Sequence, residues 1–331
     1  MDYTEYISQL LKGSPRAVAR LITFVENDID IAEKIINSIY EHTGNAYILG
    51  ITGAPGTGKS TFISTLTKFY IEQGKKVGII CVDPTSPLTG GALLGDRIRM
   101  KQNFSVNNVF IRSMANRGQL GGLARATEDV IKILDAYGCD IVIVETVGVG
   151  QSEVDIFKSA HTVVVLLVPG LGDDIQAIKS GIMEITDIFV VNKMDLQGAD
   201  KKIAEIKQML EFRKNYKYDS KEIHKRFAKI ELWTPEITKV NSKTGDNFDE
   251  LLDLIKKHKQ FLEESGVISN YMKSRITNET LQILKHKLTQ KVEELLKSNK
   301  EIGKYIDQAI EKSLDPYSMA NLIIRMLGLN N

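Results

Sequence analysis

One short stretch decides the fold of this chain: Gly53-Ala54-Pro55-Gly56-Thr57-Gly58-Lys59-Ser60. It matches G-x-x-x-x-G-K-[ST], the pattern of a phosphate-binding loop, or P-loop. An apolar run over residues 47–52 precedes it, and Phe62, Leu66 and Phe69 follow it at helical spacing. Glycines let backbone N–H groups point at phosphate oxygens, and the start of the next helix adds its positive dipole end. A strand before it and a helix after it favour a P-loop over a chance glycine turn.

The loop assigns roles to its residues. Lys59 would neutralise the β- and γ-phosphates, and the Ser60 hydroxyl would bind Mg²⁺. We expect the nucleotide to contact the whole loop and the residue after it, namely Gly53, Ala54, Pro55, Gly56, Thr57, Gly58, Lys59, Ser60 and Thr61.

Three acidic residues stand at or near the ends of predicted strands. Asp83 and Glu145 each follow an apolar run directly, and Asp96 lies in the stretch Gly95-Asp96-Arg97. Carboxylates beside a P-loop are suited to holding Mg²⁺ through its water shell or to positioning the attacking water. Each one alone is also compatible with a loop cap or a solvated carboxylate. Together, in a P-loop domain, they favour the magnesium and catalytic role.

A second motif selects the base. Asn192-Lys193-Met194-Asp195 follows an apolar run directly. In an N-K-x-D loop the aspartate accepts hydrogen bonds from the ring N–H and the exocyclic amine of guanine, and adenine lacks this pair of donors. Asn241-Ser242-Lys243-Thr244-Gly245 follows a later run, where GTPases place a loop that covers the base. We therefore expect GTP or GDP as the ligand, with base contacts from Asn192, Lys193, Asp195, Asn241, Ser242 and Lys243.

Composition argues against several other classes of protein. The 331 residues carry 43 basic and 42 acidic side chains, so no global charge favours nucleic acid or a membrane surface. The longest apolar stretch, residues 162–169, is far shorter than the roughly 20 residues that span a bilayer. The two cysteines, Cys81 and Cys139, lack the spacing of a zinc site or a disulfide framework. Because the N-terminus is acidic and has no signal-peptide pattern, we expect a cytoplasmic protein.

The chain divides into three predicted parts: a helical extension over residues 1–44, a P-loop domain over 45–262 and a helical arm over 263–331. In the middle part, apolar runs alternate with helical stretches, which predicts an α/β fold with a parallel sheet and helices on both faces. The basic stretch 213–230 interrupts this pattern and is interpreted as an inserted helix or a surface excursion. Strands are expected at 47–52, 77–82, 141–144, 163–168, 188–191 and 237–240.

The third part carries an apolar stripe at helical period from Leu281 to Ile310, with a break near Ser298-Asn299. Such a stripe must be buried on its own domain or on another subunit. The five histidines of the chain show no metal-binding spacing.

Longer stretches are similar to one family. These are residues 13–23, 82–87, 90–100, 121–126 and Glu145-Thr146-Val147-Gly148-Val149-Gly150-Gln151-Ser152-Glu153. Over residues 10 to about 265, the chain resembles the MeaB/MMAA-type (ArgK-like) GTPases. These proteins are chaperones of adenosylcobalamin-dependent acyl-CoA mutases such as methylmalonyl-CoA mutase.

The resemblance implies a P-loop GTPase fold of the SIMIBI-like class and a C-terminal arm that forms a homodimer. It implies that Ser60, Asp83, Asp96 and Glu145 are the magnesium and catalytic set, that residues 96–125 and 145–153 are switch regions, and that Lys179 belongs to an additional switch over 172–179. It also implies an acyl-CoA mutase as the partner. The sequence departs from the family at Asn241-Ser242, where Ser-Ala is usual, and at Glu236, where a second proline is common.

Three alternatives compete with this interpretation. A P-loop kinase or ATPase associated with amino-acid transport would share the loop, but no acceptor-binding pattern is present. A metal-delivery GTPase would carry a Cys/His motif, which the sequence lacks. A non-catalytic nucleotide-binding scaffold would have a defective P-loop, and this one is intact. The sequence therefore favours GTP hydrolysis, with water attacking the γ-phosphate in line.

Overall fold

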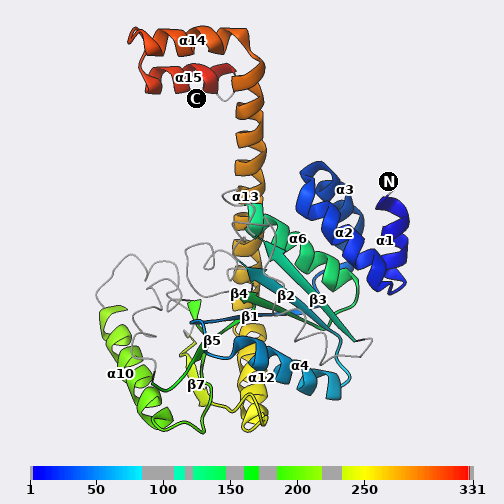
Figure 1. Cartoon of the computed structure of the whole chain (residues 1–331), viewed down its shortest axis with the longest axis vertical. Helices are drawn as coiled ribbons and strands as arrows, with labels where there is room; N and C mark the ends of the chain where they lie inside the picture. The colour runs from blue at the N-terminus through cyan, green and yellow to red at the C-terminus, as the bar shows by residue number, and fades with distance from the viewer. Residues whose placement is uncertain are drawn as a thin grey trace. The chain divides into compact units, whose positions relative to one another are not determined.

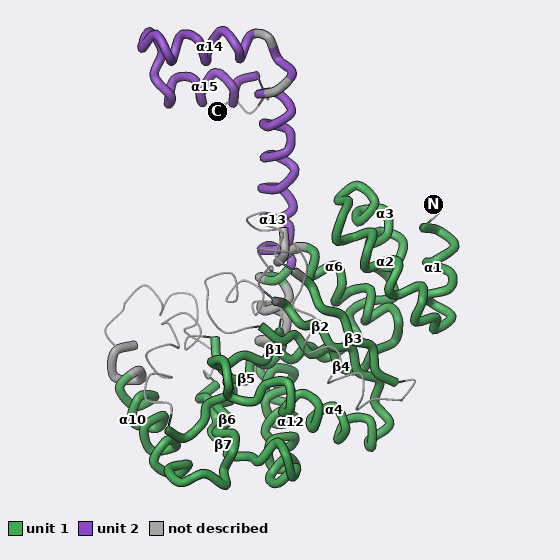
Figure 2. The backbone as a smooth tube through the Cα atoms, viewed as in Figure 1, with its two compact units in different colours: residues 1–275 green, residues 276–331 purple. Residues whose placement is uncertain are grey.

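The computed structural model describes residues 3–83, 108–115, 122–146, 160–170, 185–217, 233–326 and 328. The chain forms two compact units, residues 1–275 and 276–331 (Figure 2). The first unit contains the N-terminal helices together with the P-loop domain, and the second contains most of the predicted arm. The three-part division at residues 44 and 262 stays a prediction.

A seven-stranded sheet forms the centre of the first unit (Figure 1). Its strands are β1 (Tyr47–Gly53), β2 (Val77–Asp83), β3 (Val109–Ala115), β4 (Ile141–Thr146), β5 (Thr162–Leu167), β6 (Ile188–Val191) and β7 (Glu236–Lys239). The order is β3-β2-β4-β1-β5-β6-β7, and every neighbouring pair is parallel. Every residue of β1, β4, β5 and β6 is buried, as expected of strands covered on both faces.

The apolar runs predict six of these strands, and the structure confirms them with ends shifted by at most two residues and β6 unshifted. The prediction misses β3. In that strand only Val109, Phe110 and Ile111 form an apolar run before Arg112 interrupts it. Because β3 lies at the edge of the sheet, it tolerates this polar side chain, which forms an ion pair with Glu26 of a neighbouring helix.

Helices cover both faces of the sheet, as predicted. Helices α4 (Lys59–Glu72) and α12 (Phe248–Glu264) pack on the face that carries Leu49, Ile51 and Ile143. Helices α6 (Gly122–Ala136) and α10 (Ala199–Lys217) pack on the opposite face. Residues 213–217 of the interrupting basic stretch are thus the end of α10, and residues 218–230 lie outside the described part of the chain.

Four short elements precede the sheet: α1 (Tyr3–Leu11), α2 (Pro15–Asn27), α3 (Ile29–Ile39) and the 3₁₀ helix η1 (Tyr40–His42). The helices α1, α2 and α3 share a hydrophobic core with α6 and the sheet. Beyond them, the carboxylate of Asp135 at the end of α6 accepts hydrogen bonds from the backbone N–H groups of Gly44, Asn45 and Ala46 at 2.5, 3.2 and 3.0 Å. The predicted helical extension is therefore fastened to the sheet domain.

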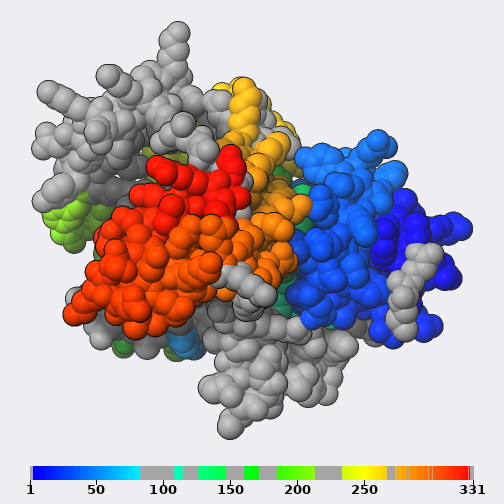
Figure 3. Space-filling view, turned by 90° about the horizontal axis from the view of Figure 1, so that it is seen from above, coloured from blue at the N-terminus to red at the C-terminus, as the bar shows by residue number. Residues whose placement is uncertain are grey.

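The second unit is helical. It contains the end of α13 (Val267–Ser298), then α14 (Lys300–Ile310) and α15 (Pro316–Met326). The predicted break lies at Asn299, whose side chain caps α14 by accepting from the N–H of Glu301 at 2.9 Å. Helices α14 and α15 lie side by side (Figures 1 and 3). Within the described ranges, no helix has the length and apolar character needed to cross a membrane.

Candidate nucleotide-binding site

The P-loop lies between β1 and α4, where the sequence places it. Gly58 directly precedes α4 and has a left-handed φ of +88°. A Cβ at this position would lie 2.8 Å from Nδ2 of Asn192, closer than real Cβ atoms approach. Glycine is therefore required at residue 58 both by its backbone conformation and by the side chain packed against it.

Bonds within the loop fix its curvature. The ammonium of Lys59 donates to the carbonyl oxygens of Gly53 at 2.8 Å and Ala54 at 3.2 Å. The hydroxyl of Thr57, which is fully buried, also donates to the Ala54 carbonyl at 2.8 Å. The loop is thus wrapped around its own lysine, and loops of this kind bind anionic ligands through backbone N–H groups.

Asn192 joins three loops. Its side-chain amide donates to the carbonyl of Thr57 in the P-loop at 2.8 Å. Its Oδ1 accepts from the N–H of Lys193 at 2.8 Å and from both the N–H and the hydroxyl of Ser242 at 3.1 and 2.7 Å. The side chain is 1% exposed. The phosphate-binding loop and the two predicted base-binding loops therefore form one connected structure.

The remaining predicted base contacts gather at the same place. The ammonium of Lys193 donates to the Gly56 carbonyl at 3.0 Å, so its stem lies along the P-loop. Asp195 is exposed, and its Oδ1 accepts from the side-chain amide of Asn241 at 3.1 Å. Lys243 is exposed beside them. Residues more than 130 positions apart in sequence thus meet at the carboxyl edge of the sheet, where parallel sheets bind ligands.

One contact of this site is not indicated by the sequence motifs. The Thr65 hydroxyl, on α4, donates to the carbonyl of Ser242 at 2.7 Å. It ties the helix that follows the P-loop to the loop that covers the base. Thr65 lies outside both motifs, and its place on α4 is the only signal the sequence gives.

The predicted magnesium residues are described in part. Ser60 is the second residue of α4, partly exposed, and Glu145 lies near the end of β4 with 8% exposure. Glu145 is in register with Ile51 of β1 and Cys81 of β2, two core residues of the face covered by α4. The thiol of Cys81 donates to its Oε2 at 3.6 Å. Glu145 therefore belongs to the same face and edge of the sheet as Ser60.

Asp83 ends β2, and its side chain is not among those described. Asp96, Lys179 and the segments 84–107, 147–159 and 171–184 lie outside the described residues. Hydroxyl and carboxylate oxygens are the donors that Mg²⁺ prefers, so Ser60 and Glu145 fit this ion in chemistry. Within the described residues, no cluster of three or more His, Cys, Asp or Glu side chains could hold a metal.

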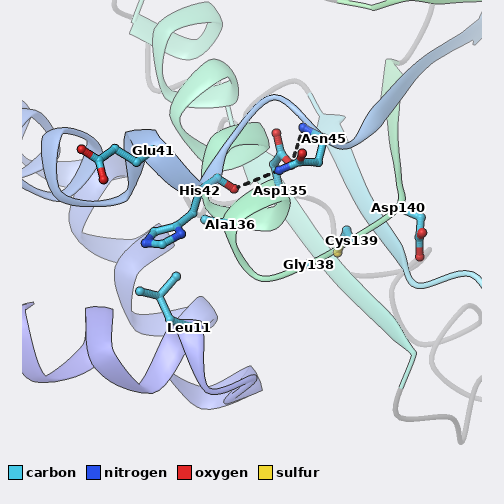
Figure 4. Close-up of a pocket in the computed structure, with 9 residues that line it drawn as sticks. All are labelled: Leu11, Glu41, His42, Asn45, Asp135, Ala136, Gly138, Cys139 and Asp140. Carbon is cyan, nitrogen blue, oxygen red and sulfur yellow. Dashed lines mark hydrogen bonds between the residues drawn. The ribbon is translucent and has the colours of Figure 1, made fainter.

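A cavity of about 490 Å³ lies at the other end of the sheet (Figure 4). It is lined by Leu11, by residues just before β1 such as Asn45, by Asp135 at the end of α6 and by Asp140 just before β4. The P-loop follows β1, so this cavity is distant from the predicted nucleotide contacts. Its most buried carboxylate, Asp135, already accepts three backbone hydrogen bonds, which hold the segment before β1 to the end of α6.

Comparison with known proteins identifies the family. The family model described as "Methylmalonyl Co-A mutase-associated GTPase MeaB" matches residues 18–297. The chain belongs to the MeaB family of GTPases. The resemblance read from the sequence is thereby confirmed, and with it the assignment of this member of the MeaB family as a GTPase.

Relatives of this MeaB-family GTPase carry consistent names. A protein of Pyrococcus horikoshii named as a GTPase is 52% identical over 98% of both chains. The GTPase ArgK of Escherichia coli is 32% identical over 92% of this chain and 89% of its own. The mitochondrial methylmalonic aciduria type A homolog of Mus musculus is 31% identical over 78% of this chain and 64% of its own. A crystal structure of a LAO/AO transport system kinase shares the fold, with a TM-score of 0.66 at 24% identity over 98% of this chain and 97% of that one.

Proposed function

We propose that this GTPase is a cytoplasmic chaperone of an adenosylcobalamin-dependent acyl-CoA mutase, with methylmalonyl-CoA mutase as the favoured partner. The observation that carries the proposal is the match of the family model, whose description names that mutase, over residues 18–297. The name of the mouse relative, which refers to methylmalonic aciduria, supports it further. The alternatives of a transport kinase and a metal-delivery protein have no comparable support, since the transport kinase shares the fold alone.

Hydrolysis would use the residues of the nucleotide site as follows. Backbone N–H groups of the P-loop and Lys59 bind the phosphates and oppose the negative charge that develops on the γ-phosphate. Asp195 accepts from guanine, and Asn192 keeps the base loops attached to the P-loop. When bound, Mg²⁺ adds further charge neutralisation, and Ser60, Asp83, Asp96 and Glu145 would hold it or its waters. The products are GDP and inorganic phosphate.

Nucleotide selectivity tests the enzymatic half of the proposal. Asp195→Ala leaves two guanine donors without an acceptor and should cost about 2–4 kcal/mol of GTP affinity, measured by calorimetry. Lys59→Ala should abolish phosphate release. If ATP binds the unaltered protein as tightly as GTP does, or if Lys59→Ala turns over normally, the site is assigned wrongly.

Coupling to the mutase requires that a partner contact the protein differently in its GTP and GDP states, a difference typically worth about 1–3 kcal/mol. The segments proposed to sense the γ-phosphate are 96–125, 145–153 and 172–179. The test is a titration of the host's mutase against the protein loaded with GDP or with a non-hydrolysable GTP analogue. Lys179→Ala should retain nucleotide binding and lose the effect of the mutase on hydrolysis. Equal affinity in both states, with hydrolysis unchanged at saturating mutase, would leave a GTPase without this chaperone role.

The same proposal includes a homodimer formed through residues near 270–331. In support, Leu281, Leu284 and Leu288 follow one helical face of α13 and are 48, 49 and 44% exposed. Exposed apolar side chains in such a row favour a protein partner. Light scattering at tens of micromolar should give a dimer for the unaltered chain and a monomer for Leu284→Glu/Leu288→Glu. Leu11→Glu, which alters a similarly exposed leucine in α1, is the matched control and should stay dimeric. A monomeric unaltered chain rejects the idea.

A further inference from the structure

Four polar side chains meet where β1, β5 and β6 begin, at the edge of the sheet opposite the P-loop. The hydroxyl of Tyr47, the first residue of β1, lies 2.5 Å from Oγ1 of Thr162, the first residue of β5. The same Oγ1 lies 2.7 Å from Nδ1 of His258 on α12. Nε2 of His258 lies 3.4 Å from Oδ1 of Asp187, which directly precedes β6. We call these four side chains the polar network.

The polar network is closed to solvent at one end and open at the other. Tyr47, Thr162 and His258 are 7, 0 and 2% exposed, whereas the side chain of Asp187 is 23% exposed. Oδ2 of Asp187 accepts from the N–H of Val163 at 2.8 Å, so Oδ1 is the oxygen that faces His258. A proton from solvent therefore reaches the network at Asp187.

The hydrogen bonds of the network have two allowed directions, because a hydroxyl donates or accepts and a neutral imidazole has one donor and one acceptor. With Asp187 ionised, the Nε2–H of His258 faces the carboxylate. Nδ1 then accepts from Thr162, which accepts from Tyr47. One added proton gives the pair Asp187–His258 two hydrogens, and only one of them fits between Oδ1 and Nε2. The other lies on Nδ1, which becomes a donor to Thr162, and Thr162 becomes a donor to Tyr47.

The pair takes up this proton near neutral pH. Burial raises the pKa of Asp187 to about 7 and lowers the pKa of His258 to about 4. Because the two groups lie so close, their protons belong to the pair. The ionisable side chains around the network are Tyr70 on α4, His161 before β5, Glu236 on β7, Lys257, Lys259 and Glu263 on α12, and Arg275 on α13. Burial, and not the charge of any of these groups, is the main cause of both shifts.

From this geometry we propose that the polar network is a proton-operated switch: one proton bound by Asp187 and His258 reverses the hydrogen bonds that join α12, β5 and β1. Reversal changes the far end of the network. The O–H of Tyr47 no longer donates to Thr162, and the described part of the chain offers it no second bond. A proton gained at Asp187 thus removes a hydrogen bond at the start of β1, the strand that leads into the P-loop. This inference does not depend on the proposed mutase partner.

The test is the ¹⁵N spectrum of the full chain labelled at its histidine side chains, because a bare ring nitrogen resonates far downfield of one that carries a hydrogen. The chain has five histidines, and His258→Gln and His161→Asn assign the signals of the two buried ones. As the pH falls from about 9 to about 6, Nδ1 of His258 should change from bare to protonated, with a midpoint near pH 7. His161 is the internal control, since its Nδ1 accepts from the N–H of Ile48 at 2.9 Å and should stay bare.

Asp187→Asn fixes the direction of the network. The amide oxygen takes the place of Oδ2 and accepts from Val163, so the NH₂ group faces Nε2 of His258 and donates to it. Nδ1 should then carry its hydrogen at every pH in this range. Glu236→Gln is the matched control: it neutralises a nearby carboxylate that forms an ion pair with Lys257 at 2.6 Å, and it should titrate like the unaltered protein.

Three results would overturn the proposal. In the unaltered protein, Nδ1 of His258 could stay bare down to about pH 6, which would mean that the proton is bound without reversing the network. It could already carry a hydrogen at about pH 9, which would mean that the network has a single direction. The third result is an Asp187→Asn protein that titrates like the unaltered one, because the carboxylate would then not be the partner of His258.

Discussion

The hydrogen bonds of Asn192 allow a quantitative prediction for the substitution Gly58→Ala. An alanine in the left-handed region costs about 1–2 kcal/mol relative to glycine. In addition, its Cβ would lie 2.8 Å from Nδ2 of Asn192, which must move. Asn192 is 1% exposed and bonds to Thr57, Lys193 and Ser242, so its displacement leaves at least one buried polar group unpaired, at about 1–3 kcal/mol. The expected loss in free energy of unfolding is about 2–5 kcal/mol.

Two glycines of the same chain separate the two contributions. Gly56 in the P-loop has a φ of +85° and Gly74 after α4 has a φ of +77°, and a Cβ at either would meet nothing within 4 Å. Gly56→Ala and Gly74→Ala should therefore show the conformational cost alone, about 1–2 kcal/mol. Urea unfolding of the nucleotide-free protein, followed by circular dichroism, measures all three. If Gly58→Ala is no less stable than Gly56→Ala, Asn192 does not hold the loops together as argued.

Three further predictions concern other parts of the first unit. Arg275→Ala should cost about 2 kcal/mol of stability in the same urea assay, because Arg275 lies 3.0 Å from Glu128 and the two side chains are only 15 and 12% exposed. Lys75→Ala should cost under about 0.5 kcal/mol, because Lys75 and its partner Asp140 are 47 and 41% exposed. Burial, with Arg275 and Lys259 nearby, lowers the pKa of His161 to about 4 from its ordinary 6.5, so the stability of the fold should fall as the pH drops from 6.5 to 4. His161→Asn keeps an acceptor for the Ile48 N–H and should reduce that fall by up to about 3 kcal/mol. Equal pH profiles of stability for the two proteins would contradict this. Asp187 opposes the loss, since burial raises its pKa to about 7 and the folded state then gains stability on protonation below pH 7; Asp187→Asn should make the acid transition steeper, and a shallower one would count against this assignment.

Most of the fold follows from local sequence signals. The P-loop pattern, the Val- and Ile-rich runs and the helical spacing of Phe62, Leu66 and Phe69 each depend on neighbouring residues, and the structure confirms them. The missed strand β3 shows where such signals end. After Ile111, Arg112 lies on a strand at the edge of the sheet and forms an ion pair with Glu26, in a helix far away in sequence. A local pattern of residues indicates neither the edge position nor this ion pair.

The candidate site was predictable as a set of residues but not as an arrangement. The N-K-x-D pattern predicts Asn192 as a contact of the base, and nothing in its four residues indicates a bond to Thr57, 135 positions earlier, or to Ser242, 50 positions later. Those bonds depend on β1, β6 and β7 ending at the same edge of the sheet, which is a property of the whole topology.

The arrangement bears on how the protein could respond to its nucleotide. Since Asn192 attaches the P-loop to both base loops, the base side of the site is held by direct hydrogen bonds within the chain. A change between GTP and GDP must therefore act on other segments that can sense the γ-phosphate. We expect the effect of the γ-phosphate to begin at the end of β4, where Glu145 lies, and to continue through α6. The ion pair Glu128–Arg275 joins α6 to the start of α13. If a change between the GTP and GDP states is transmitted along α6, Arg275→Ala should weaken it. The same variant should keep its affinity for guanine nucleotides, because the base loops held by Asn192 set that affinity.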